Sequence, residues 1–109
     1  MTPDELLQNL RGLELELRSA EVQSAVAALP PDQRTRFVTE RQKLSASIGR
    51  LENAELSGIL SRLNANEDSL KDGIASLRRE IDSVERTVAI VNAVGTVAGF
   101  AARVAGLTG

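Results

Sequence analysis

The side chains that most often carry out catalysis are missing from this sequence. Histidine, cysteine, tyrosine and tryptophan do not occur, so an active site would have to use Asp, Glu, Lys, Arg, Ser or Thr. Without histidine the Glu-plus-His pattern of a di-iron bundle is excluded, and without cysteine disulfides and zinc–sulfur sites are excluded too. Glu14 and Glu21 are spaced as two helical turns would place them, but a solvated acidic face explains that pair. We therefore expect a non-enzymatic protein with no catalytic, cofactor-binding or metal-binding residues.

Charge and composition also argue against nucleic acid and small-molecule substrates as partners. The net charge is -2, and Phe37 and Phe100 are the two aromatic residues. Binding to nucleic acid depends on neutralising phosphates and, for single strands, on base stacking, so this composition is a poor match. The segment 34–43, RTRFVTERQK, holds four bases and one acid. We interpret it as a solvated face, with contact to anionic lipid or to an acidic partner as the alternative.

Length and residue types predict a single all-α domain of 109 residues. Leucine, valine, alanine and isoleucine recur at helical spacing, which favours either a three-helix antiparallel bundle or a helical hairpin with a long coiled-coil second arm. The chain does not open with a basic segment followed by an apolar run, so we expect no cleaved signal peptide. The compartment stays open between the cytoplasm, export without a cleaved signal, and a membrane-associated location.

The first helix is predicted over residues 3–29. Thr2 and Pro3 form a helix start, and Glu5 completes a capping box with Thr2. One apolar seam consists of Leu6, Leu10, Leu13, Leu17 and Ala20, and a weaker stripe consists of Leu15, Val22, Val26 and Leu29. Pro30 and Pro31 remove two backbone donors and mark a turn at 29–32.

A second helix is predicted over residues 32–63, with a shift of its apolar stripe near Asn53. The segment 64–66 is ambiguous, because Asn66 followed by Glu67 and Asp68 is typical of a helix start, although the apolar register continues across it. A break there gives a third helix over 67–107 and is the favoured interpretation. Without a break, one helix of about 75 residues would span roughly 110 Å.

The third predicted helix has the most regular heptad pattern of the chain. Its seam is formed by Leu70, Ile74, Leu77, Ile81, Val84, Val88 and Val91. Such a seam is typical of an ordinary bundle helix, and it is also the pattern by which helices of separate chains associate as coiled coils.

The tail, residues 87–109, is apolar and rich in small residues. Gly95, Gly99, Ala102 and Gly106 fall on one helical face, and Gly95 with Gly99 forms a G-x-x-x-G that lets two helix backbones approach closely. Between Arg86 and Arg103 lie sixteen uncharged residues, about 24 Å of helix, which is short of the roughly 30 Å hydrocarbon core. We expect the tail to be an ordered helix that packs against this chain, a second copy or lipid. Its valines would otherwise form an exposed apolar surface, which favours association.

These patterns predict an assembly or interaction protein that self-associates through its third helix and tail. Homo-oligomers or a helical protein partner are the expected partners. The interaction residues are the seam from Leu70 to Val91 and the small residues Gly95, Gly99, Ala102 and Gly106. The alternative is a membrane-associating or membrane-inserting protein, similar in architecture to small pore-forming or lysis proteins, that uses the apolar tail.

Overall fold

The described residues of the computed structural model, 1–83 and 85–107, form a bundle of five α-helices without a strand. The helices are α1 (Pro3–Leu17), α2 (Ala20–Ala27), α3 (Pro31–Asn53), α4 (Leu56–Ser83) and α5 (Thr87–Ala105). The chain measures 42 × 23 × 19 Å, so it folds back on itself and has no extended arm. The all-α class and the bundle predicted from the sequence are confirmed.

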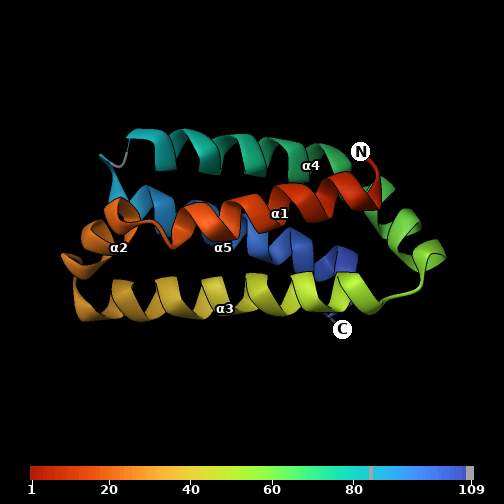
Figure 1. Cartoon of the computed structure of the whole chain (residues 1–109), viewed down its shortest axis with the longest axis horizontal. Coiled ribbons are helices and arrows are strands. Elements are labelled where there is room, and N and C mark those ends of the chain that lie inside the picture. Colours follow the sequence, from red (N-terminus) through yellow and green to blue (C-terminus); the bar gives the residue numbers. More distant parts are fainter. Residues whose placement is uncertain (84, 108–109) are drawn as a thin grey trace.

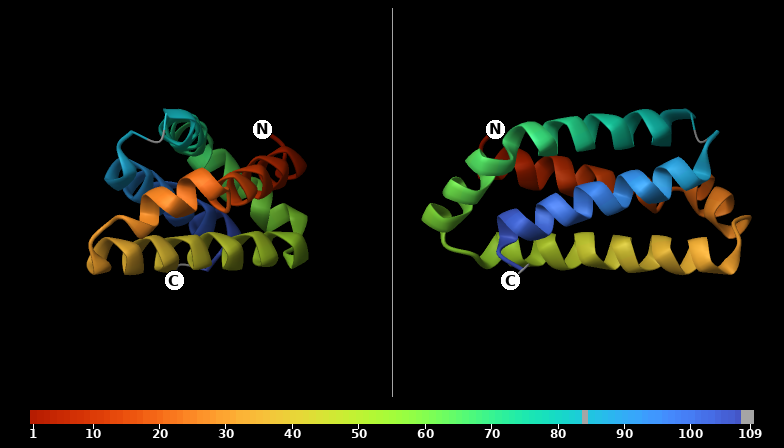
Figure 2. Two further views of the ribbon diagram at one scale, coloured as in Figure 1. Left: turned by 60° about the vertical axis from the view of Figure 1, so that its left-hand side comes forward. Right: turned by 180° about the vertical axis from the view of Figure 1, so that it is seen from behind.

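The four longer helices are arranged so that α3 and α4 form the two sides, while α1 and α5 cover opposite faces of the space between them. Figure 1 shows α1 in front of this space and α5 behind it, and the rear view in Figure 2 shows α5 lying between α3 and α4. α3 and α5 run in the same direction, and α1 and α4 run in the opposite one. α5 therefore packs against both side helices and leaves one surface facing away from the bundle.

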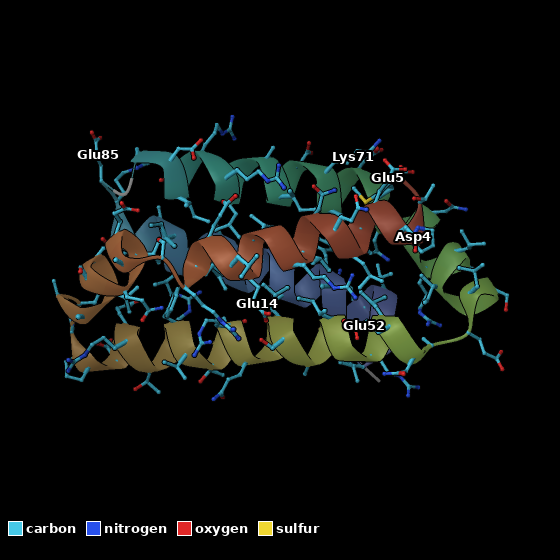
Figure 3. All side chains as sticks on the ribbon, in the orientation of Figure 1. Asp4, Glu5, Glu14, Glu52, Lys71 and Glu85 are labelled. Atoms are coloured by element: carbon cyan, nitrogen blue, oxygen red, sulfur yellow. The ribbon has the colours of Figure 1, made fainter. Side chains whose placement is uncertain are left out.

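Leucines and valines from every helix form one continuous core. Leu6, Leu10, Leu13 and Leu17 of α1 are completely buried, as predicted for this seam. Polar bonds at the edges join α1 to its neighbours. Arg11 Nη2 donates to Glu52 Oε1 of α3 at 2.8 Å, and Ser45 of α3 donates to Glu14. Figure 3 shows Glu14 and Glu52 along the boundary between α1 and α3.

The predicted helix 3–29 is wrong, because the chain breaks at Arg18 and Ser19 into α1 and α2. Ser19 is the N-cap of α2, and its side chain accepts a hydrogen bond from the Val22 amide at 3.3 Å. The Gln23 side chain donates to the carbonyl of Leu17 at 3.0 Å and satisfies the end of α1. The break turns α2 so that Val22 and Val26 reach the core, while Leu15 is 70% exposed. A turn is present where one was predicted at 29–32, but it lies at 28–30, because α3 already begins at Pro31.

The predicted helix 32–63 is also wrong, because α3 ends at Asn53 and α4 begins at Leu56. The Asn53 side chain donates to the Gly49 carbonyl at 2.9 Å, and Ala54 is extended. The break favoured at 64–66 is absent, since α4 is one helix over this stretch. Its first turns, green in Figure 2, nevertheless lie at an angle to the rest of the helix. The Asn66 side chain donates to the Arg62 carbonyl at 2.7 Å within this helix.

The predicted helix 67–107 is interrupted as well, because α4 ends at Ser83 and α5 begins at Thr87. Arg86 precedes α5 in a non-helical conformation and donates through Nη2 to Glu80 Oε1 at 2.7 Å. This turn sends α5 back along α4, so the apolar faces of both helices meet inside one chain. The register assumed to run unbroken from Leu70 to Val91 is therefore divided between two antiparallel helices.

Candidate interaction surface on α5

One side of α5 is buried in the core. The buried residues are Ile90, Val91, Val94, Val97, Ala98, Ala101, Ala102, Val104 and Ala105. Alanine accounts for four of these positions, and short side chains let α3 and α4 approach the α5 backbone. Gly73 of α4 contributes to the same fit, because a Cβ atom there would lie 3.4 Å from Val97 Cγ2.

The opposite side of α5 is a narrow surface that we call the α5 strip. It consists of Val88, Asn92, Gly95, Thr96, Gly99 and Arg103. Gly95 and Gly99 are half-buried and the other four are exposed. Their spacing places all six on one helical face, and Arg103 at one end carries the only formal charge among these six residues.

Two shallow hollows lie along the α5 strip and share Thr96 and Phe100. One, of about 270 Å³, is lined by Gly95, Gly99 and Arg103 as well. The other, of about 350 Å³, lies between α4 and α5 and is lined also by Ser69, Asp72, Gly73, Ser76 and Ala93. The Arg103 guanidinium lies over the Phe100 ring at 5.0 Å from its centroid and covers part of that ring.

The two glycines of the strip differ in what surrounds them. A Cβ atom at Gly95 would lie 3.5 Å from Glu40 Cδ of α3, which is an ordinary contact. A Cβ atom at Gly99 would have no atom within 4 Å beyond its chain neighbours and its own helix backbone. Packing within the chain therefore does not require glycine at residue 99.

Polar bonds fix α5 to both of its neighbours. On the α3 side, Arg36 Nη1 donates to Asn92 Oδ1 at 2.6 Å. On the α4 side, Arg62 Nε donates to the Val104 carbonyl at 2.7 Å and places a cation at the negative end of the α5 dipole. The Arg62 guanidinium fits between two glycines, because Cβ atoms at Gly58 and Gly106 would lie 3.2 and 3.3 Å from it. Gly106 ends α5 with a φ of 77°, a conformation that favours glycine.

The small residues predicted to interact are not all on the surface. Gly95 and Gly99 belong to the α5 strip, but Ala102 is buried and Gly106 is the exposed cap of the helix. The small face predicted from spacing is therefore turned partly toward the core. Sequence reasoning missed Thr96, Phe100 and Gly73, which line the hollow between α4 and α5. Their pairing depends on how two helices align, which the sequence pattern does not contain.

The predicted seam lies mainly inside the chain. Leu70, Ile74, Leu77, Ile81 and Val91 are buried in the core of this chain, whereas Val88 is 44% exposed on the α5 strip. Val84 lies outside the described residues. In the folded chain, the buried members of the seam are therefore not part of the surface that a second molecule could contact.

Outside the α5 strip, another hollow lies where α2 meets the end of α4. It measures about 530 Å³ and is lined by Glu16, Ser19, Glu21, Ile81, Asp82 and Ser83. Glu14 accepts from Ser45 and Glu21 is on a different helix, so the pair noted in the sequence does not share one helical face. Within the described part of the chain, no three acidic side chains form a group that could hold a metal ion.

By length and composition alone, α5 is the one helix among the described residues that could cross a membrane. Half of the apolar stretch of α5 is buried inside the bundle. The core helices of soluble bundles share this composition, because they too are apolar on several sides.

No family model matches the chain, and neither a curated protein nor a solved structure shows significant similarity to it. The described residues place the protein in the class of all-α helical bundles. Its function must be argued from the α5 strip, since fold class by itself does not determine function.

Proposed function

We propose that this protein is a non-enzymatic assembly module that self-associates through the α5 strip. The observation that carries the proposal is Gly99, a helical glycine on the surface that no contact within the chain requires. A glycine in a helix interior costs about 1 kcal/mol relative to alanine. Close approach of a second helix at Gly95 and Gly99 would offset that cost through backbone contact.

The surroundings of the strip support the same proposal. Gly12 of α1 and Gly49 of α3 also have open space above them, so an uncompensated glycine does not by itself mark an interface. Gly12, however, is flanked one turn away by Gln8 and Glu16, which keep that face solvated. Gly99 is flanked by Gly95, Thr96 and Phe100 and by two hollows that neighbouring side chains could fill. Gly49 is flanked one turn away by Ser45 and Asn53, whose side chains both make hydrogen bonds within the chain. We therefore assign the interface to α5 and not to α1 or α3.

Glutamine substitutions at two matched glycines test the proposal. Gly99→Gln places a bulky, soluble side chain on the α5 strip, whereas Gly12→Gln places the same side chain on α1. Both positions are open in the folded chain, so both variants should keep the fold. By sedimentation velocity over a wide concentration range, the wild type and Gly12→Gln should dimerise, and Gly99→Gln should stay monomeric. A monomeric wild type, or a Gly99→Gln variant that dimerises normally, would rule out this interface.

A second candidate function, association with a membrane through α5, is favoured by the length and composition of that helix. It requires α5 to leave the contacts that Arg62 and Arg36 make with it. Flotation with anionic liposomes tests it. Thr96→Asp puts a charge in the middle of the apolar segment, and Ser61→Asp puts the same charge on an exposed part of α4 as a control. Insertion predicts that Thr96→Asp alone loses flotation. Absence of flotation by the wild type removes this candidate.

A further inference from the structure

A polar hollow lies at the turn between α3 and α4, at the same end of the bundle as the last turn of α5 (Figure 1). It measures about 380 Å³ and shares no lining residue with the two hollows of the α5 strip. Two arginines from different helices line it, Arg50 of α3 and Arg62 of α4. The other lining residues are Asn53, Ala54, Glu55 and Gly58. The lining therefore contains two cations and one acid.

The guanidinium of Arg62 is fixed in position by its surroundings. Its Nε donates to the Val104 carbonyl at 2.7 Å. Cβ atoms at Gly58 and Gly106 would lie 3.2 Å from Nη1 and 3.3 Å from Nη2, so both glycines leave room for the guanidinium. Because Gly58 lines the hollow, the Nη1 atom beside it lies at the hollow too. The hydrogen bonds of the described residues use Nε of Arg62, and the N–H groups of Nη1 and Nη2 are left for a ligand.

Neither arginine is neutralised by an acid in the part of the chain that the structure describes. The ion pairs among residues 1–83 and 85–107 include neither Arg50 nor Arg62. Glu55 lines the same hollow, yet it forms none of these pairs. Two guanidiniums at one hollow repel each other, and a bound anion would relieve that repulsion. The hollow is therefore suited to an anion.

A phosphate group fits two guanidiniums better than a carboxylate does. One arginine can satisfy both oxygens of a carboxylate through its paired N–H donors. A phosphate monoester carries up to two negative charges and three terminal oxygens, so it can accept hydrogen bonds from two arginines at once. We propose that the hollow at the α3–α4 turn binds a phosphate monoester group between Arg50 and Arg62. This site goes beyond self-association through the α5 strip and does not depend on it.

Titration of the full chain with inorganic phosphate, at constant ionic strength, tests the site by nuclear magnetic resonance. The backbone amide of Gly58 and the Nε–H of Arg62 should shift and reach saturation. Acetate should bind about fivefold more weakly, because its single charge and two oxygens can be satisfied by one arginine. Shifts that do not saturate with phosphate overturn the site, and equal affinity for acetate overturns the assignment to phosphate.

Matched substitutions on α3 separate a specific site from general attraction to positive charge. Arg50→Gln should raise the dissociation constant for phosphate about tenfold, because it removes a charged donor. Arg34→Gln, about 24 Å away along α3, should leave it unchanged. Both side chains are exposed, so both variants should keep the fold. Unchanged affinity in Arg50→Gln, or an equal loss in Arg34→Gln, overturns the proposal.

The remaining charges of the hollow give two further tests. Glu55→Gln should lower the dissociation constant about threefold, because an exposed carboxylate that repels the ligand is removed. Arg62→Lys keeps the positive charge but loses the paired donors, so it should weaken binding, with circular dichroism as the check of the fold. A weaker affinity in Glu55→Gln, or an unchanged one in Arg62→Lys, contradicts the proposed geometry.

The phosphate group could belong to a soluble ester or to a lipid headgroup, and two probes distinguish these sources. O-phosphoserine represents the soluble ester, and phosphatidylcholine vesicles that contain phosphatidic acid represent the lipid. Saturable binding of O-phosphoserine that is weakened in Arg50→Gln supports a soluble ligand. Flotation with the vesicles that is lost in Arg50→Gln supports a lipid. Binding of inorganic phosphate without either of these results overturns the assignment to a monoester.

Discussion

Replacing Gly99 with alanine should stabilise the folded chain. The new methyl group would have no atom within 4 Å outside its own helix and chain neighbours, so it causes no clash and gains no contact. What remains is the difference in helix propensity, which favours alanine by about 0.8–1.0 kcal/mol. For a domain of this size, that difference raises the melting temperature by roughly 4 °C or somewhat more.

The same substitution at Gly106 should have the opposite sign. Gly106 has a φ of 77°. Because the left-handed conformation costs other residues about 1–2 kcal/mol, an alanine there should lower the free energy of unfolding by about that amount. Gly49→Ala provides the matched control for Gly99→Ala, because residue 49 is also helical with open space above it. Gly99 within α5 and Gly106 at its C-cap therefore separate the effect of helix propensity from that of backbone conformation.

Urea unfolding followed by circular dichroism, at a protein concentration below that of association, measures all three variants. We expect higher midpoints for Gly99→Ala and Gly49→Ala and a lower one for Gly106→Ala, with unchanged slopes. If Gly99→Ala is destabilising while Gly49→Ala is stabilising, the folded monomer must pack something against residue 99. The claim that this glycine is uncompensated within the chain would then be refuted.

Three further predictions concern the ends of helices. Arg62→Met should lower the free energy of unfolding by about 1–2 kcal/mol and speed amide exchange in the last turn of α5, because the Val104 carbonyl loses its charged donor. Thr2→Ala should cost about 1 kcal/mol in urea unfolding, because the Glu5 amide donates to the Thr2 hydroxyl at 3.1 Å in the capping box. The hydrogen bond from the Thr2 backbone amide lowers the pKa of Glu5 below its ordinary value. Its stabilising contribution is therefore present above about pH 4.3 and is lost as the pH falls through the lowered pKa, so Glu5→Gln should flatten the decline of melting temperature below that pH.

Strong local signals in the sequence predicted part of the fold. The capping box at Thr2 and the turn at Pro30 and Pro31 were predictable because cap and proline chemistry act within a few residues. The leucine seam of α1 was predictable because helical spacing places it on one face. The breaks at Ser19 and Asn53 were not, because each depends on one side chain that bonds to a nearby backbone group. In the sequence such residues resemble ordinary polar positions on a helix surface.

The candidate site could be predicted only in part. Spacing identified Gly95 and Gly99 as neighbours on one face of an apolar helix. It did not indicate which side of α5 would face the bundle, because valines and alanines are distributed around most of the helix. The orientation of α5 is determined by α3 and α4, because both helices pack on the side that carries Val94, Val97 and Ala101. Gly95 and Gly99 therefore remain on the outer side. The seam of α4 was mistaken for an intermolecular one because a partner within the chain and a partner from another chain require the same apolar pattern.

The position of α5 in the chain has a consequence for biosynthesis. Of the five helices described it is synthesised after the other four, and both α3 and α4 pack against it. While the ribosome is still extending the polypeptide, the sides of α3 and α4 that pack against α5 are uncovered, and we expect the earlier helices to form at most a loose intermediate. We therefore expect the core to be completed only after residues 87–105 have emerged from the ribosome.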